Sequence, residues 1–244
     1  MKTVVLIPSR LKATRLPGKP LLKINGLSII SHVVKKAIKA DIGEVYVATE
    51  DPEIILDVKQ NGGEAILTSK NHKTGTDRIF EALQKIGKTN IKLVVNLQGD
   101  EPLMNIDDIK NLHNMMSQTK TMIGTLASNI KDKNLYFKES IVKVKTKESF
   151  EKSKFPQAIN FMRKLENPSE NTYHHLGIYC YDFETLKNFV SLNQSKNEIQ
   201  NKLEQLRALD NNIKINVALA KYSPIGVDTM EDFVAIKKIM EYKS

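Results

Sequence analysis

The sequence predicts an α/β fold in which a mostly parallel sheet lies between two layers of helices. In the first hundred residues, short apolar runs of strand length alternate with segments of helical spacing. One run, residues 92–98, is hydrophobic along its centre, which is typical of a strand buried on both faces. With 244 residues, 41% of them hydrophobic, the chain is long enough to bury a full core. These observations predict a three-layer α/β domain.

Turn and capping residues divide the first half of the chain into elements. Helix 51–63 has Pro52 in its first turn, and Thr76 is expected to cap a helix that ends at Gly87. Strands separated by helices in this way predict βαβ units. The expected strands are 4–7, 44–50, 64–69 and 92–98, and the expected helices are 27–40, 51–63 and 76–87.

The second half of the chain has a different pattern. Segments 122–130 and 140–146 have the composition of antiparallel or edge strands, and residues 147–172 are polar and irregular. We therefore predict one domain, 1–244, that carries a smaller β-rich insertion at about 120–190. The other expected elements are strands 173–182 and 213–220 and helices 183–190, 195–212 and 228–242, the last with Asp228 or Thr229 as N-cap.

The net charge of +9 fits either a nucleic-acid-binding protein or an enzyme for anionic substrates. The lysines are scattered without an arginine-rich block, which favours a solvated enzyme surface over a nucleic-acid site. No segment approaches the roughly 20 apolar residues of a membrane helix, and the first ten residues lack the pattern of a signal peptide, so we expect a cytoplasmic protein. The single cysteine, Cys180, lies in an apolar stretch and is expected to be buried rather than reactive.

A basic loop follows the first expected strand, over residues 8–21. It holds Arg10, Lys12, Arg15 and Lys19 within ten residues. In an open parallel sheet, ligands bind at the carboxyl ends of the strands, so this loop is placed to bind an anion such as a triphosphate. The alternative is a basic surface loop. The two common phosphate-binding glycine motifs are absent, which disfavours P-loop and dinucleotide-binding proteins.

Acidic residues follow the fourth expected strand, in the sequence QGDEP at 98–102. Mg²⁺ prefers hard oxygen ligands and few of them, so Asp100 is a candidate magnesium ligand. The alternative is that this segment caps a helix beginning near 105. Asp228 is the second candidate ligand, and a plain N-cap explains it equally well.

Three further groups of residues have positions or spacings that suggest a role. Gly75, Thr76 and Arg78 lie where a loop meets a helix, a place that favours anions, with simple capping as the alternative. Glu204 and Arg207 have the i, i+3 spacing of a surface ion pair. The histidines at 174 and 175 are adjacent on an expected strand and face opposite sides, and no further ligand has the spacing of a zinc site.

Several of these motifs together resemble one family. The segment IPSRLKATRLPGKPL resembles the opening loop of the CMP-sugar-acid synthetases. The segments TGTDRI, VNLQGDEP, HHLGIYCY, LEQLRAL and GVDTMEDF then follow in the order and spacing of the bacterial 3-deoxy-manno-octulosonate (Kdo) cytidylyltransferases. The resemblance spans essentially the whole chain.

The resemblance implies a Rossmann-like nucleotidyltransferase fold, usually as a homodimer, with the β-rich insertion contributing to the sugar site and the dimer contact. The implied reaction joins CTP and Kdo to give CMP-Kdo and pyrophosphate, for lipopolysaccharide biosynthesis, with Mg²⁺ as cofactor. The implied residues are Arg10, Arg15 and Lys19 for the triphosphate; Asp100 and Asp228 for Mg²⁺; and Arg78, Gln98, His175, Tyr179, Glu204 and Gln205 for the sugar acid, with Arg78 facing its carboxylate. Gly75 and Thr76, which lie at the loop-to-helix junction, and Asp100 are also expected at the nucleotide.

The sequence departs from the family's pattern at two places. The first loop begins PSR where many relatives have PAR, and Glu151 and Lys152 stand where Ser and Arg are usual. A related sugar acid, such as 8-amino-Kdo or a sialic-type acid, therefore remains an alternative substrate, as does a sugar phosphate. The alternative from another class is a non-catalytic nucleic-acid-binding protein, which gives no reason for QGDEP at the end of a strand.

Overall fold

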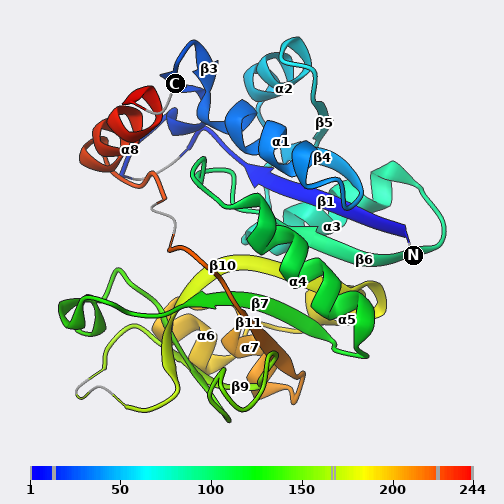
Figure 1. The fold of residues 1–244 in the computed structure, drawn as a ribbon. Helices are drawn as coiled ribbons and strands as arrows, with labels where there is room; N and C mark the ends of the chain where they lie inside the picture. Colours follow the sequence, from blue (N-terminus) through cyan, green and yellow to red (C-terminus); the bar gives the residue numbers. More distant parts are fainter. Residues whose placement is uncertain (1, 13–14, 166, 168, 224–225, 243–244) are drawn as a thin grey trace. The chain divides into compact units, whose positions relative to one another are not determined.

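The computed structural model describes residues 2–12, 15–165, 167, 169–223 and 226–242, and they form two compact units (Figure 1). Unit 1 combines Met1–Asp107 with Pro224–Ser244, and unit 2 is Asp108–Ser223. The segment predicted as an insertion, about 120–190, lies within unit 2. Among the described residues, no helix combines the length and apolar character needed to span a bilayer.

Unit 1 contains a parallel sheet in the order β6-β1-β4-β5. Its strands are β1 (Lys2–Ser9), β4 (Glu44–Thr49), β5 (Glu64–Leu67) and β6 (Ile91–Asn96). The centres of β1 and β6 are buried, as expected for strands covered on both faces. The predicted parallel sheet is confirmed, and its strand ends place the loops that follow β1 and β6 next to each other.

Three helices connect these strands: α1 (Ile29–Ala40), α2 (Pro52–Gln60) and α3 (Gly75–Ile86). Before α1 lie the short 3₁₀ helix η1 (Lys19–Leu21) and a hairpin of β2 (Lys23–Ile24) and β3 (Leu27–Ser28). The prediction that Thr76 caps α3 is wrong. The cap is Thr74, whose Oγ1 accepts a hydrogen bond from the amide of Asp77 at 3.1 Å.

The C-terminal helix α8 (Met230–Tyr242) belongs to unit 1. Ile236 and the preceding Val227 are fully buried in an apolar cluster with Leu16, Ile24 and Ile29. Thr229 is the N-cap, since its Oγ1 accepts from the amide of Asp232 at 3.2 Å and its own amide donates to the Asp232 carboxylate at 2.9 Å. The side chain of Asp228 therefore does not cap the helix.

Unit 2 is a mixed sheet with the path β11-β7-β10, extended by β8 and β9. Strand β7 (Ile123–Ser128) pairs in parallel with β11 (Ile215–Leu219) and antiparallel with β10 (Thr172–Asp182). The antiparallel strands β8 (Lys143–Thr146) and β9 (Ala158–Met162) continue from the start of β10. Cys180 in β10 is buried, as predicted. Strand β9 was not predicted.

The helices of unit 2 are α5 (Phe183–Ser191), α6 (Lys196–Asn201) and α7 (Leu206–Asp210), with the 3₁₀ helix η2 (Lys133–Tyr136). Helix α4 (Ile106–Gln118) begins in unit 1 and continues in unit 2. The prediction of one long helix over 195–212 is wrong. The chain leaves α6 at Lys202, whose φ of 52° is left-handed, and α7 begins only at Leu206.

Candidate active site

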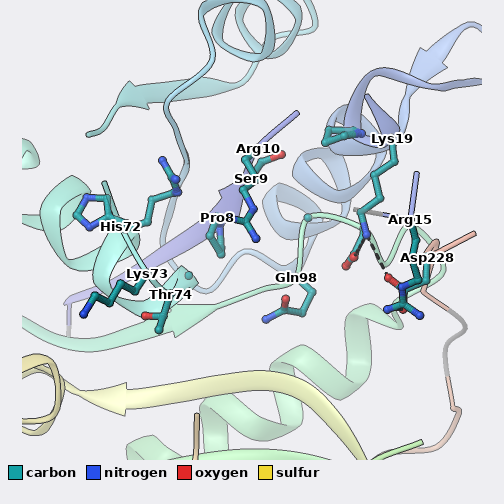
Figure 2. Close-up of a pocket in the computed structure, with 15 residues that line it drawn as sticks. Pro8, Ser9, Arg10, Arg15, Lys19, His72, Lys73, Thr74, Gln98 and Asp228 are labelled. Carbon is teal, nitrogen blue, oxygen red and sulfur yellow. Dashed lines mark hydrogen bonds and ion pairs between the residues drawn. The ribbon is translucent and has the colours of Figure 1, made fainter. Parts of the chain in front are cut away.

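Unit 1 has a pocket at the carboxyl ends of its strands (Figure 2). One part of its wall is formed by the end of β1 and the loop that follows, and another by the β5–α3 loop with the start of α3. The segment after β6 and Asp228, which lies shortly before α8, complete the wall. The lining residues that were predicted as site residues are Arg10, Arg15, Lys19, Gly75, Arg78, Gln98, Asp100 and Asp228. Residues that were predicted as site residues in distant parts of the sequence thus line one pocket.

The two candidate magnesium ligands contact the same ammonium group. The Nζ of Lys19 donates to Asp100 Oδ2 at 2.5 Å and to the backbone oxygen of Val227 at 2.8 Å, and it lies 3.4 Å from Asp228 Oδ1. Figure 2 shows Lys19 extending from its loop toward Asp228. Arg15 completes the group, with its guanidinium 2.9 Å from Asp228 Oδ2. Asp100 and Asp228 therefore converge on one cation.

The backbone explains why these carboxylates meet. The amide of Val227 donates to the backbone oxygen of Asp100 at 2.9 Å, which fixes the segment before α8 against the segment after β6. Gly99 allows a close approach to β1, because a Cβ atom there would lie 3.0 Å from the backbone oxygen of Pro8 and 3.1 Å from Ile30 Cδ1. Neither carboxylate is a helix cap. Asn105 accepts from the amide of Asp107 at the start of α4, and Thr229 caps α8.

This arrangement fits a magnesium site. Two carboxylates that share one ammonium group offer hard oxygen donors to a cation, and Mg²⁺ typically takes only one or two such protein ligands together with substrate oxygens. Among the residues described, no group of three or more His, Cys, Asp or Glu side chains could hold a metal. Asp100 and Asp228 alone would leave the other positions around such a cation to substrate oxygens and water.

Glu101 is a third carboxylate at this site, and the sequence analysis gave it no role. Burial, together with the negative charges of Asp100 and Asp228, raises the pKa of Glu101 to about 8, although the positive charge of Lys19 acts to lower it. Its Oε2 atom is buried without a hydrogen-bond partner among the described residues. At neutral pH this carboxyl group is therefore mainly protonated, which limits the negative charge next to the two ligands.

The β5–α3 loop forms another part of the wall, with His72, Lys73 and Thr74. Glu81 of α3 anchors it by accepting from the amide of Ser69 at 2.9 Å and by contacting His72 Nε2. Burial acts to raise the pKa of Glu81, but hydrogen bonds from Lys85, Ser69 and His72 outweigh it and lower the pKa to about 2. Thr76, predicted at the nucleotide, is buried beneath the wall and does not line the pocket.

Arg78 lines the pocket but is itself almost fully buried, with 4% of its side chain exposed. Its Nη2 lies 2.5 Å from Glu50 Oε2, and its Nη1 donates to Thr68 Oγ1 at 2.7 Å and to the backbone oxygen of Ser69 at 3.2 Å. Glu50 was not predicted as a site residue. It follows β4, and no spacing in the sequence links it to Arg78.

The other predicted sugar residues lie in unit 2. In β10, His175 Nε2 is 3.0 Å from Thr125 Oγ1, and the His175 ring centroid is 5.5 Å from that of Tyr179. Burial lowers the pKa of His175 to about 3, with the neighbouring His174 adding to the shift. Burial raises the pKa of Tyr179, and the charges of Tyr181 and Glu204 raise it further. Gln205 is buried and precedes α7.

Glu204 and Arg207 form the predicted i, i+3 ion pair, but the pair does not lie on the surface, because Arg207 is buried. Arg207 is buried and forms a two-pronged ion pair with Glu198, with N–O distances of 2.8 and 2.6 Å. Glu204 lies farther away, at 3.7 Å from the Arg207 guanidinium. The guanidinium also packs 4.7 Å from the ring centroid of Phe189. Arg207 therefore stabilises unit 2 from inside.

Comparison with known proteins gives consistent results. The family model described as cytidylyltransferase matches residues 4–215. The 3-deoxy-manno-octulosonate cytidylyltransferase of Thermodesulfovibrio yellowstonii is 41% identical over 98% of both chains, and that of Afipia carboxidovorans is 41% identical over 98% of this chain and 96% of its own. A solved structure of a CMP:2-keto-3-deoxy-manno-octonic acid synthetase complexed with CTP is 33% identical, covers both chains fully and has a TM-score of 0.90. The predicted nucleotidyltransferase fold is thereby confirmed.

Proposed function

The chain belongs to the cytidylyltransferase family, and from this premise we propose that it is a CMP-Kdo synthetase, which joins CTP and Kdo and releases pyrophosphate. The observation that carries the proposal is the meeting of Asp100 and Asp228 at Lys19, beside the arginines of the first loop. Such a group of cations and carboxylates suits a metal-bound nucleoside triphosphate.

The reaction is a displacement at phosphorus. An oxygen of the anomeric hydroxyl of Kdo forms a bond to the α-phosphorus of CTP, the bond from that phosphorus to the bridging oxygen breaks, and pyrophosphate leaves with the electron pair. The hydroxyl proton passes to water. This chemistry needs little covalent help from the protein, so positioning and charge neutralisation are its main tasks.

The residues of the pocket divide these tasks. Arg10, Arg15 and Lys19 bind phosphate oxygens and stabilise the charge that develops on the pyrophosphate. Asp100 and Asp228 hold Mg²⁺, which when bound neutralises charge on the substrate oxygens. Arg78 and Gln98 bind the sugar acid in the pocket of unit 1. The family resemblance also assigns His175, Tyr179, Glu204 and Gln205, which belong to unit 2, to the sugar acid.

The test is a pyrophosphate-release assay with CTP, Mg²⁺ and a panel of acids that contains Kdo, 8-amino-Kdo and a sialic acid. We expect Kdo to be the preferred acid, because the relatives carry that name at about two-fifths identity over nearly their full length. Glu151 and Lys152, which raised the question of another acid, are both exposed in the structure. Turnover of 8-amino-Kdo alone would overturn the choice of substrate.

We expect Asp100→Asn to reduce turnover by roughly 100-fold or more, because an amide cannot replace the negative charge of a metal ligand. The circular dichroism spectrum should stay that of the wild type. Asp41→Asn is the matched control, since it makes the same chemical change at an exposed residue of unit 1 whose left-handed backbone Asn tolerates. Activity of Asp100→Asn close to that of the control would refute the ligand assignment.

The remaining parts of the proposal concern the cell. We expect a cytoplasmic homodimer that supplies CMP-Kdo to lipopolysaccharide assembly and does not bind nucleic acid. Light scattering in solution tests the dimer. A DNA-binding titration at two salt concentrations tests the absence of nucleic-acid binding, because binding driven by the +9 charge would be strong and steeply salt-dependent.

A further inference from the structure

Arg78 differs from the other cations of the pocket in how it is held. The side chain of Arg15 is 60% exposed and pairs with Asp228, which is itself 48% exposed. Arg78 is 4% exposed, and its carboxylate partner Glu50 is 8% exposed. A guanidinium and a carboxylate buried together have lost most of their hydration, so each depends on the other for its charge compensation.

The contacts of Arg78 fix its guanidinium in one orientation. Two strand ends and one helix take part, because Glu50 follows β4, Thr68 and Ser69 follow β5, and Arg78 itself lies in the first turn of α3. In the part of the chain that the structure describes, these contacts use both N–H groups of Nη1 and one of Nη2. The second N–H of Nη2 and the Nε–H are then the donors left for the pocket.

The ion pair also decides what kind of recognition Arg78 provides. Its positive charge is compensated inside the protein by Glu50, so it adds little to the long-range attraction of anions that an exposed cation such as Arg10 supplies. What remains is a rigid pair of directed N–H groups. A carboxylate, like a phosphate, has two oxygens whose geometry matches two such donors, and in the proposed function Arg78 faces the carboxylate of the sugar acid.

We propose that Glu50 is a positioning residue, which holds Arg78 in the orientation that binds the carboxylate of the sugar acid. This inference rests on the proposed function, in which Arg78 contacts that substrate. It adds a specificity role for a buried residue that does not itself line the pocket.

The direction in which KM for Kdo changes distinguishes the positioning of Arg78 from an effect of charge alone. Glu50→Gln keeps an oxygen acceptor for Arg78 but removes a negative charge close to the pocket. If Glu50 acted through charge alone, its loss would make the site more positive and lower KM for both anionic substrates. If Glu50 positions Arg78, KM for Kdo should rise by roughly 10-fold or more, whereas KM for CTP should change by less than about 3-fold.

The matched control is Glu53→Gln. Glu53 lies three residues further along the chain in the first turn of α2 and is exposed, so its replacement changes the net charge equally without touching Arg78. We expect both KM values of this variant to stay within about 2-fold of the wild type, as is usual for exposed charges. Glu50→Gln with an unchanged or lower KM for Kdo, or with equal increases for both substrates, would overturn the proposal.

Two further variants keep the test decisive. Glu50→Asp retains the charge on a shorter side chain and should raise KM for Kdo less than Glu50→Gln does. If Glu50→Gln does not fold, the KM values of Glu50→Asp for Kdo and CTP are compared with those of Glu53→Gln instead. Arg78→Gln separates the inference from the proposed function. If Arg78→Gln leaves KM for Kdo unchanged, the assignment of Arg78 to the sugar acid fails; if it raises KM and the Glu50 variants do not, only the role of Glu50 fails.

Discussion

The ammonium group of Lys19 contacts both candidate magnesium ligands, at 2.5 Å from Asp100 and 3.4 Å from Asp228. A metal ion that binds these carboxylates must compete with it. The side chain of Lys19 is only 14% exposed, so water screens this ion pair less than it screens the pair of Arg15 and Asp228. We therefore expect Lys19 to oppose metal binding until phosphate oxygens attract its ammonium group.

We expect Lys19→Gln to bind Mn²⁺ roughly 10-fold more tightly than the wild type when no nucleotide is present, because removal of the ammonium leaves the carboxylate charges to the metal. Mn²⁺ binding can be followed by titration with electron paramagnetic resonance. Lys12→Gln removes the same charge from the same loop at an exposed residue that does not line the pocket. Equal affinities of the two variants would contradict the competition.

At the scale of single residues, the sequence predicted Asp100 and Asp228 because a carboxylate after a buried strand or before a helix has a recognisable place in an α/β fold. It did not predict Glu50, since Glu50 and Arg78 are 28 positions apart and only the folded sheet brings them together. Arg207 shows the same limit. Its candidate by helical spacing was Glu204, which lies 3.7 Å away, whereas its closest partner in the structure is Glu198, nine positions away across the break between α6 and α7.

At the scale of elements, the periodic segments of unit 1 were predicted within a few residues, and the errors lie where local and long-range effects compete. Strand β9 lies in a polar, irregular segment, and it exists through its pairing with β8, for example Val144 opposite Phe161. Two threonines near the start of α3 could each cap it, and sequence alone does not decide between Thr74 and Thr76. Apolar residues with helical spacing continue across the break between α6 and α7, so periodicity did not reveal it.

That break gives a prediction about stability. Lys202 has a left-handed backbone with φ of 52°, and its amide donates to the backbone oxygen of Glu198. A residue with a Cβ atom is strained there, so we expect Lys202→Gly to raise the free energy of unfolding by about 0.5–1 kcal/mol. Denaturant titration measures it. Asn201→Gly, one residue earlier at the end of α6, should instead destabilise, and a loss of stability in Lys202→Gly would contradict the assigned backbone.

At the scale of the whole molecule, buried histidines make the protein sensitive to acid. Burial lowers the pKa of His174 to about 4, with the charge of Lys143 contributing, and lowers that of His175 to about 3. Both values are below the ordinary 6.5 of the unfolded chain. Between these limits the unfolded state binds more protons than the folded state, so stability falls as the pH falls from about 6.5.

We expect His175→Gln to show a weaker loss of stability than the wild type between pH 6.5 and 4.5, by up to about 1.4 kcal/mol per pH unit in the limit of one full proton. Denaturant titrations at three pH values measure the difference. The comparison with the wild type cancels the contribution of Glu101, whose raised pKa acts with the opposite sign throughout this range. If the stability of the two proteins falls in parallel as the pH falls, His175 takes up its proton equally in the folded and unfolded states, which contradicts the prediction.

Unit 1 is built from two segments of the chain, and the second carries both Asp228 and the apolar residues Val227 and Ile236. On a ribosome, Lys19 is made 209 positions before the aspartate that it contacts. At typical rates of synthesis this interval is roughly 10 to 40 seconds. During it, the nascent chain holds a basic loop without one of its carboxylates, and Leu16, Ile24 and Ile29 lack the residues that cover them. The candidate metal site and this part of the core are therefore completed together, late in translation, and we expect a partly synthesised chain to lack the proposed activity.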